Sequence, residues 1–382
     1  PGRISVSDAV YFDFQARKQR PSRVEVDGPM AKVPFQILSF DGGGIRGAFG
    51  IGLITELESR LGRPVTDYFD LIAGTSTGAI TGAGLALGKS GAELTDFYEQ
   101  YGRQIFSRRE PFLPQGLIRW LYPSARWLLR KRTGQDADDF FRARYCPFAL
   151  RDSFEACFGK SSLADVEATR LIVPTVNLSK GQSHIFRSPH LPDLRHDADV
   201  EIVDVLLAAT AAPTYFPHQV MPDGHAYCDG GLWAVNPSIL AIAEAMRIKQ
   251  QCRRQTCDPD YDTEDIRVLS IGTGDVRYSL SPPGADAGII YWAQHVADVM
   301  TNLQVEGVQS PLTFFLGDRY HCANFQIPDA TWTLDNTDRI HELFRLGRAK
   351  AEEDFETLVQ KFFDGRQPRF VPFENLAEGT EA

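Results

Sequence analysis

The segment Gly74-Thr75-Ser76-Thr77-Gly78 restricts the fold of this chain more than any other part of the sequence. It follows residues 71–73, a short apolar run typical of a buried strand, and precedes residues 78–87, a run of small residues typical of a closely packed helix. A serine between two glycines at such a junction stands on a tight turn that exposes its hydroxyl group. We therefore expect Ser76 to be a nucleophile in an α/β protein. The alternative is a chance match in an ordinary glycine turn.

The pattern of apolar residues predicts the architecture. Short apolar runs at residues 35–40, 71–73, 171–173 and 266–271 predict strands, and apolar residues at helical spacing predict helices between them and over residues 343–363. This alternation predicts a three-layer α/β/α domain whose central sheet is mainly parallel. We expect residues 1–34 to form an N-terminal arm and residues 35–382 to form the domain, with a helical cap insertion at about residues 106–165.

Composition and charge limit the functional class. The net charge of −10 argues against a nucleic-acid partner. No apolar run approaches the roughly 18 residues that span a bilayer, and the N-terminal segment has no apolar signal-peptide core. None of the six cysteines forms a C-x-x-C pair, so free thiols are expected rather than a metal site. These features predict a cytoplasmic protein that needs no bound metal.

A second glycine-rich segment, Asp41-Gly42-Gly43-Gly44-Ile45-Arg46-Gly47, directly follows the first predicted strand. Consecutive glycines allow several backbone N–H groups to converge on one anion, such as the oxyanion of an acyl-transfer intermediate. Arg46 either braces this loop or adds to its positive field. The segment also matches G-x-G-x-x-G, so a dinucleotide-binding Rossmann turn is a competing interpretation. Against it, Asp41 would place a carboxylate beside the pyrophosphate, and no ribose-binding acid ends the second strand.

The third segment, Asp229-Gly230-Gly231, is by itself typical of a turn. Downstream of an exposed serine, its carboxylate becomes a candidate general base, because burial raises the pKa of an aspartate from about 3.9 toward a useful range. A Ser–His–Asp triad of the α/β-hydrolase type is the competing interpretation and requires a histidine late in the chain. The candidates, none of which carries a recognisable motif, are His218, His225, His295, His321 and His341.

In this order, the three motifs resemble those of the patatin-like phospholipase family, D-G-G-G-x-[RK]-G, G-x-S-x-G and D-G-[GA]. Residues 209–217 are similar to the family's S-A-A-P-x-Y-F segment, and Ser270-Ile271-Gly272-Thr273-Gly274 is similar to its S-x-G-T-G segment. The resemblance covers about residues 35–280 outside the insertion. Thr210 replaces a frequent serine of the family, a change expected to affect packing more than chemistry.

The resemblance implies a serine lipid acyl hydrolase that releases fatty acids from membrane glycerophospholipids through an acyl-serine intermediate, without metal or cofactor. Some bacterial members of similar sequence are antiviral effectors switched on by cyclic nucleotides. A cyclic-nucleotide activator and a homo-oligomer are therefore further expectations. The site residues implied are Ser76 as nucleophile, Asp229 as its base, and Gly42, Gly43, Gly44 and Arg46 at the oxyanion hole.

The cap insertion combines basic and aromatic residues in a way that suits an anionic membrane surface. The alternative is an ordinary cap packed on the core. We expect peripheral contact with the inner face of the cell membrane, and a cap that covers the site until the activator binds. The basic residues are Arg108, Arg109, Arg119, Arg126, Arg130, Lys131 and Arg132, and the aromatic ones are Phe106, Phe112, Trp120, Tyr122 and Trp127.

Overall fold

The computed structural model describes residues 33–109, 127, 142–252, 261–275, 288–329 and 331–365. The predicted arm over residues 1–34 therefore lies outside the described residues, except for its last two positions, which begin the first strand. A unit of residues 1–32 is separate from the unit that begins at Val33. The fold below is that of the second unit.

Among the described residues, the central sheet has eight strands, ordered β5-β6-β3-β2-β1-β7-β8, with β4 paired to β3. β1 lies parallel to β2 and β7, and β3 and β8 continue the parallel sheet on either side. β4 and β6 pair with β3 in antiparallel fashion, as β5 does with β6. The prediction of a mainly parallel sheet is confirmed. The strands are β1 Val33–Phe40, β2 Leu71–Gly74, β3 Arg170–Asn177, β4 Gln182–Arg187, β5 Gln219–Val220, β6 Ala226–Asp229, β7 Tyr261–Ile271 and β8 Tyr320–Ala323.

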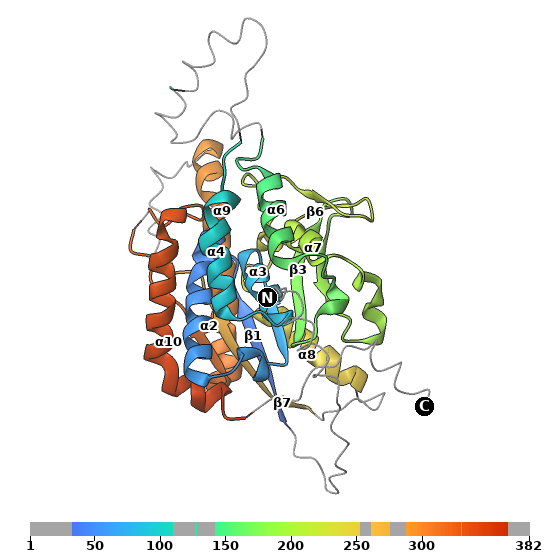
Figure 1. The fold of residues 1–382 in the computed structure, drawn as a ribbon, viewed down its shortest axis with the longest axis vertical. Helices are drawn as coiled ribbons and strands as arrows, with labels where there is room; N and C mark the ends of the chain where they lie inside the picture. The colour runs from blue at the N-terminus through green and yellow to red at the C-terminus, as the bar shows by residue number, and fades with distance from the viewer. Residues whose placement is uncertain are drawn as a thin grey trace, which may run out of the picture. The chain divides into compact units, whose positions relative to one another are not determined.

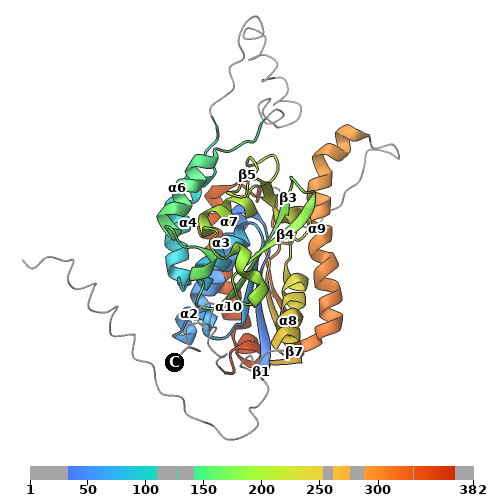
Figure 2. The same ribbon diagram turned by 90° about the vertical axis from the view of Figure 1, so that its right-hand side faces the viewer.

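Helices cover both faces of this sheet, as Figure 2 shows. The α-helices are α2 Ala48–Leu61, α3 Thr77–Ala86, α4 Gly91–Ile105, α6 Pro147–Phe158, α7 Ile202–Ala209, α8 Ser238–Cys252, α9 Ile289–Leu316 and α10 Ile340–Phe362. The short 3₁₀ helices are η2 Gly44–Gly47, η3 Val65–Asp67, η5 Leu163–Asp165, η6 Pro192–Asp197, η7 Gly230–Leu232, η8 Gly317–Arg319 and η9 Thr337–Arg339.

Alternation along β1 divides the protein interior into two apolar cores. Leu38 and Phe40 face the larger core, which contains side chains of α2, α3, α4, α6, α7 and α10. Phe35 and Ile37 face the opposite way, toward α8 and the end of α9. Successive strand residues point to opposite faces, so a strand covered on both faces is apolar throughout. This arrangement confirms the three-layer α/β/α prediction.

Two helices far apart in the sequence, α2 and α10, lie side by side (Figure 1). Their backbones approach closely at two glycines. A Cβ atom on Gly52 would collide with the carbonyl of Phe344, and one on Gly347 would collide with the carbonyl of Phe49. The C-terminal helix is thereby fixed against the helix that follows the glycine-rich loop.

Part of the predicted insertion at residues 106–165 belongs to the larger apolar core. Leu150, Phe154 and Phe158 of α6 are buried in the larger core. Residues 110–126 and 128–141, which include most of the basic and aromatic positions, lie outside the described residues, so the cap itself stays a prediction. Within the described ranges, no helix combines the length and the apolar character needed to cross a bilayer.

Candidate active site

The carboxyl ends of β1 and β2 bring the two glycine motifs together. Phe40 and Gly74, the last residues of these strands, are partners in the parallel pairing. The N–H of Thr75 continues the pairing by donating to the carbonyl of Phe40 at 3.2 Å. The loop after β1 and the serine turn after β2 therefore leave the sheet at the same edge, as parallel strands require.

Ser76 occupies a strained turn between β2 and α3. Its backbone has φ 55° and ψ −122°, a conformation that residues with a side chain rarely adopt. Tight packing holds the turn, because a Cβ atom on Gly74 would collide with the carbonyl of Gly78, and one on Gly78 would collide with Phe40. A larger residue at either glycine of the motif would therefore clash with the backbone. The turn presents Ser76 Oγ away from the sheet.

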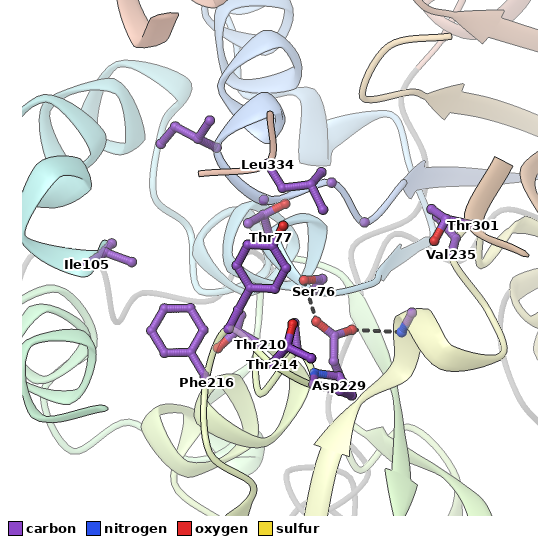
Figure 3. Close-up of a pocket in the computed structure, with 18 of the residues that line it drawn as sticks. Ser76, Thr77, Ile105, Thr210, Thr214, Phe216, Asp229, Val235, Thr301 and Leu334 are labelled. Atoms are coloured by element: carbon purple, nitrogen blue, oxygen red, sulfur yellow. Dashed lines mark hydrogen bonds between the residues drawn. The ribbon is translucent and has the colours of Figure 1, made fainter. Parts of the chain in front are cut away.

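Asp229, at the end of β6, faces Ser76 across the site. Ser76 Oγ donates to Asp229 Oδ2 at 2.6 Å, and the N–H of Gly231 donates to Asp229 Oδ1 at 2.7 Å (Figure 3). Asp229 is 4% exposed. Burial raises the pKa of this carboxyl to about 6, although the two hydrogen bonds act in the opposite direction. The carboxylate is therefore a proton acceptor close to neutral pH, in contact with the serine hydroxyl.

The glycine-rich loop lies against Ser76. The N–H of Gly42 donates to the carbonyl of Val235 at 2.9 Å, so this group is already bonded within the protein. Thr273 Oγ1 donates to the carbonyl of Gly42 at 2.9 Å and fixes the loop from the other side. Within the described part of the chain, the N–H groups of Gly43 and Gly44 have no hydrogen-bond acceptor. Two backbone donors are thus left for a bound anion.

Arg46 braces the loop that carries these glycines. Its Nε donates to the carbonyl of Gly43 at 3.4 Å. The next N–H, that of Ile45, donates to the carbonyl of Leu334 at 2.8 Å. Asp41 is buried and does not line the cavity. Its burial, with Asp275 nearby, raises the pKa of its carboxyl well above the usual range.

A largely apolar cavity of about 270 Å³ contains Ser76 and Asp229. Tyr98, Ile105, Phe216 and Leu334 are among its lining residues. Thr210 also lines it, and its hydroxyl donates to the carbonyl of Leu206 at 2.7 Å. The threonine hydroxyl is thus used within the end of α7, in agreement with the packing role expected for it.

No histidine is among the described residues that line the cavity. His321 pairs with Asp354 at 3.0 Å and His225 with Asp223 at 2.9 Å, both outside the cavity. His341 is 3.6 Å from Glu99 and mostly exposed. His218 is exposed, and the side chain of His295 lies outside the described residues. The four candidates whose side chains the structure describes therefore make no contact with Ser76.

A different histidine, not singled out from the sequence, has the connectivity of a triad. His190 Nδ1 is 3.0 Å from Ser188 Oγ, and its Nε2 is 3.1 Å from Glu244 Oε1. Ser188 is fully buried and also accepts the N–H of Leu171 at 3.0 Å. Since none of the three residues lines the cavity, we interpret this network as structural. No sequence motif marks it, because its members are isolated residues.

The described residues contain no group of three or more histidine, cysteine, aspartate and glutamate side chains placed to hold a metal ion. The free cysteines among them are Cys146, Cys157, Cys228 and Cys322. The arrangement at Ser76 needs none of these side chains. It consists of a hydroxyl, a carboxylate and two backbone N–H groups beside an apolar cavity.

Comparison with known proteins identifies the family. A family model described as patatin-like phospholipase matches residues 38–242. The chain is 35% identical to the cGAMP-activated phospholipase of Vibrio cholerae over 65% of this chain and 66% of that protein. It is also 35% identical to a protein of that name from Escherichia coli strain TW11681, over 67% and 66%.

A third relative, the cGAMP-activated phospholipase of Pseudomonas aeruginosa, is 31% identical over 83% of this chain and 85% of its own length. The chain thus covers just under two thirds of the length of the first two relatives and most of the third. The match to the family model includes the end of β1, the serine turn, Asp229 and the start of α8. The chain belongs to the patatin-like phospholipase family, a family of carboxylic ester hydrolases.

Proposed function

We propose that this protein is a serine lipid acyl hydrolase that releases fatty acids from membrane glycerophospholipids. The observation that carries the proposal is the 2.6 Å hydrogen bond from Ser76 Oγ to the buried carboxylate of Asp229, inside an apolar cavity. Such a pair activates a hydroxyl nucleophile without a histidine, provided that the carboxylate is basic enough. Burial supplies that basicity, since it raises the pKa of Asp229 to about 6.

In the proposed mechanism, Asp229 Oδ2 takes the proton of Ser76 while Oγ attacks the acyl carbonyl carbon of the lipid ester. The negative charge that develops on the carbonyl oxygen is stabilised by the N–H groups of Gly43 and Gly44. The protonated Asp229 then gives its proton to the leaving oxygen of the lysolipid, and acyl-Ser76 remains. Water, deprotonated by Asp229, attacks this ester, and the fatty acid leaves as Ser76 recovers its proton.

Hydrogen bonds within the glycine-rich loop reduce the number of N–H groups that are available for the proposed oxyanion hole. The N–H of Gly42 is bonded to Val235, so the role falls to Gly43 and Gly44, the next two residues. Arg46 contacts the carbonyl of Gly43, which favours a bracing role over direct contact with the oxyanion. The helix N-terminus of α3 behind Ser76 adds positive potential at the same place.

The cavity supports an acyl chain as the bound part of the substrate. Aromatic and aliphatic side chains line most of it, and among the described lining residues the charged one is Asp229, which contacts Ser76. This composition suits a site that orients an apolar ligand by one reactive group. A dinucleotide would instead bring charged phosphates to this apolar wall. The family assignment gives the dinucleotide-binding alternative no support. We place the reaction at the inner face of the cell membrane, where phospholipid is available.

We also propose that a cyclic nucleotide switches on hydrolysis, and that the protein has a role in antiviral defence. The support is the similarity to three phospholipases that are named as cGAMP-activated. An enzyme that digests membrane lipid must be inactive until it is needed. To move a two-state gate from mostly closed to mostly open, the activator must bind the open state more tightly by about 5 kcal/mol.

The hydrolase proposal is tested with a fluorophosphonate probe and with phospholipid vesicles. The wild-type protein should be labelled at Ser76 and should release fatty acid, and Ser76→Ala and Asp229→Asn should each abolish release while the protein still folds. Ser183→Ala is a matched control, because Ser183 is exposed on β4 and does not line the cavity. Activity within about tenfold of wild type in either site variant would contradict the assignment.

Activation is tested in the same vesicle assay with and without a panel of cyclic nucleotides that includes cGAMP. Little release without nucleotide, and strong release with one member of the panel, is the expected result. High basal release that no nucleotide changes would contradict activation while leaving the hydrolase proposal intact. Lipid analysis of cells expressing wild type and Ser76→Ala would then identify the headgroup and the acyl position that is cleaved.

A further inference from the structure

The cavity opens to the surface beside α9. Most of its lining side chains are buried or half-buried, and the exposed ones are Pro213, Thr214, Leu232 and Ala297. Leu232 of η7 and Ala297 of α9 belong to elements that are joined, because Gln304 Nε2 donates to the carbonyl of Leu232 at 3.4 Å. Figure 3 shows Thr301 of α9 on the same side of the cavity as Val235. One rim of the entrance to Ser76 is therefore formed by α9.

An apolar stripe runs along α9 next to this entrance. We define it as Trp292, Val296, Met300, Leu303 and Phe314, whose exposed fractions are 45%, 40%, 52%, 59% and 86%. At about 100° per residue, these positions fall within roughly 80° of one another around the helix. Figure 2 shows α9 as the outermost helix on the α8 side of the sheet. The stripe is densest from Trp292 to Leu303, and Gly307 and Ser310 separate this part from Phe314. Leu232, 47% exposed, adds an apolar side chain at the entrance.

The charge of α9 is unusual for a surface helix. Its 28 residues contain Asp298 and Glu306 but no lysine or arginine. Both acids are exposed but fall outside the roughly 80° arc of the stripe, so the stripe itself carries no charged side chain. A contact made by this face must depend on burial of apolar surface, and attraction to anionic groups contributes nothing to it.

We propose that the apolar stripe of α9 is the surface with which the protein rests on a lipid bilayer, so that an acyl chain passes from the bilayer into the cavity at Ala297 and Leu232. The inference rests on the proposed function, because it explains how a membrane lipid reaches a site that binds acyl chains. A second copy of the chain is the competing occupant. It is disfavoured because a partner seated on this rim would cover the entrance to Ser76.

The experiment uses the full chain with Val296→Gln, Met300→Gln and Leu303→Gln combined, none of which lines the cavity. Binding to phosphatidylcholine vesicles is measured by flotation in a Ser76→Ala background, so that the vesicles stay intact. The triple variant should bind at least about tenfold more weakly, since three side chains no longer enter the acyl layer. The single variant Met300→Trp, with a larger interfacial side chain, should bind more tightly.

A matched control separates the stripe from exposed apolar residues in general. Met246 of α8 is 49% exposed, close to the 52% of Met300, and does not line the cavity. Met246→Gln should bind vesicles as the wild type does. In the active background, with the activating nucleotide present, the triple variant should hydrolyse a water-soluble short-chain ester at the wild-type rate but should release little fatty acid from vesicles.

Each alternative gives a different result. Unchanged vesicle binding by the triple variant would overturn the proposal. The proposal would also be overturned if wild-type binding required anionic lipid or were lost in about 1 M NaCl, where the Debye length is roughly 3 Å. Such salt-sensitive binding would point to the basic residues of the predicted insertion. A change from dimer to monomer in lipid-free sedimentation, with normal vesicle binding, would identify an interface between copies. If neither the wild type nor any variant hydrolyses an ester, the proposed function is contradicted. The vesicle-binding measurements would still show whether the stripe of α9 contacts the bilayer.

Discussion

Arg144 and Asp335 form an ion pair of 2.8 Å, and both side chains are less than one fifth exposed. Asp335 also accepts the hydroxyl of Tyr145 at 2.5 Å. Its neighbour Leu334 accepts the N–H of Ile45 at 2.8 Å. The ion pair therefore connects a described part of the predicted insertion with the segment that holds the loop carrying the proposed oxyanion donors.

We predict that Asp335→Asn weakens both folding and catalysis. The amide is uncharged, so it keeps at most a weaker hydrogen bond from Arg144, and a partly buried guanidinium is left without its counter-ion. The free energy of unfolding should fall by about 1–3 kcal/mol. Because Leu334 then holds the glycine loop less firmly, kcat on a water-soluble ester should fall several-fold while KM changes little. Urea unfolding and steady-state kinetics measure the two effects.

Asp338→Asn is the control for this prediction. Asp338 lies three residues later in the chain, is 85% exposed on its side chain and is 3.7 Å from Arg103. An exposed pair of this kind contributes little, so stability should change by less than about 1 kcal/mol. Equal effects of the two substitutions would show that Asp335 acts only through the net charge of the region.

A second prediction concerns the buried Ser188–His190–Glu244 network. His190→Gln should lower the free energy of unfolding by about 1–3 kcal/mol, because buried partners lose a hydrogen bond. The value of kcat on the water-soluble ester should stay within about threefold of wild type. His341→Gln, at a mostly exposed position, should change neither quantity. A loss of about 10⁴ in kcat for a folded His190 variant would instead indicate a histidine triad.

Local sequence was enough to predict the parts of the site that depend on the order of strands and turns. Ser76 and Asp229 are 153 residues apart, yet both follow strands of one sheet, and each motif sits where its strand ends. The contact of Gly42 with Val235 could not be predicted. It depends on how the loop after η7 folds back over β1, and a glycine N–H has the same sequence signature whether it is bonded or free.

Two other differences have a similar cause. The basic and aromatic residues that precede α6 in the sequence favour a cap, whereas Leu150, Phe154 and Phe158 of this helix are buried in the larger core. α9 was not predicted at all. Its apolar residues occur on several sides, so the periodicity expected of a helix with one buried face is weak. The exposed stripe becomes visible only when the buried side, at Leu312, is known.

A third prediction tests the glycine loop. A Cβ atom on Gly43 would collide with Oγ1 and Cβ of Thr273, so Gly43→Ala should displace the loop and its N–H groups. Loss of an oxyanion donor costs roughly 10²–10³ in kcat. Adding Thr273→Gly makes room for the methyl group. The double variant should have a kcat at least about tenfold higher than that of Gly43→Ala, although the hydrogen bond to Gly42 is then missing.

Gly307→Ala serves as the control, because a Cβ atom there meets nothing within 4 Å. On a water-soluble ester this variant should match the wild type, and its helix should be slightly more stable, by up to about 1 kcal/mol. If Gly43→Ala were equally active, Gly43 would not belong to the oxyanion hole.

The last prediction concerns pH and follows from the burial of Asp229. The carboxylate must be ionised to accept the proton of Ser76, and burial raises its pKa to about 6. The value of kcat/KM on a water-soluble ester should therefore fall about tenfold per unit as the pH decreases below 6, and should reach a plateau above it. A profile that is flat from pH 5 to pH 8, by stopped-time assay in constant ionic strength, would contradict Asp229 as the base.

The same shift makes stability depend on pH. In the unfolded chain this carboxyl has its ordinary pKa of 3.8, whereas in the folded protein burial raises the pKa to about 6. Between these values the folded state binds more protons, so raising the pH destabilises the wild type. Asp229→Asn cannot ionise and escapes this penalty. Its stability relative to wild type should therefore increase by up to about 3 kcal/mol between pH 4 and pH 7, measured by urea unfolding. A difference between the two proteins that does not change with pH would show that Asp229 is ionised throughout, and the proposed base would then lack the basicity that burial gives it.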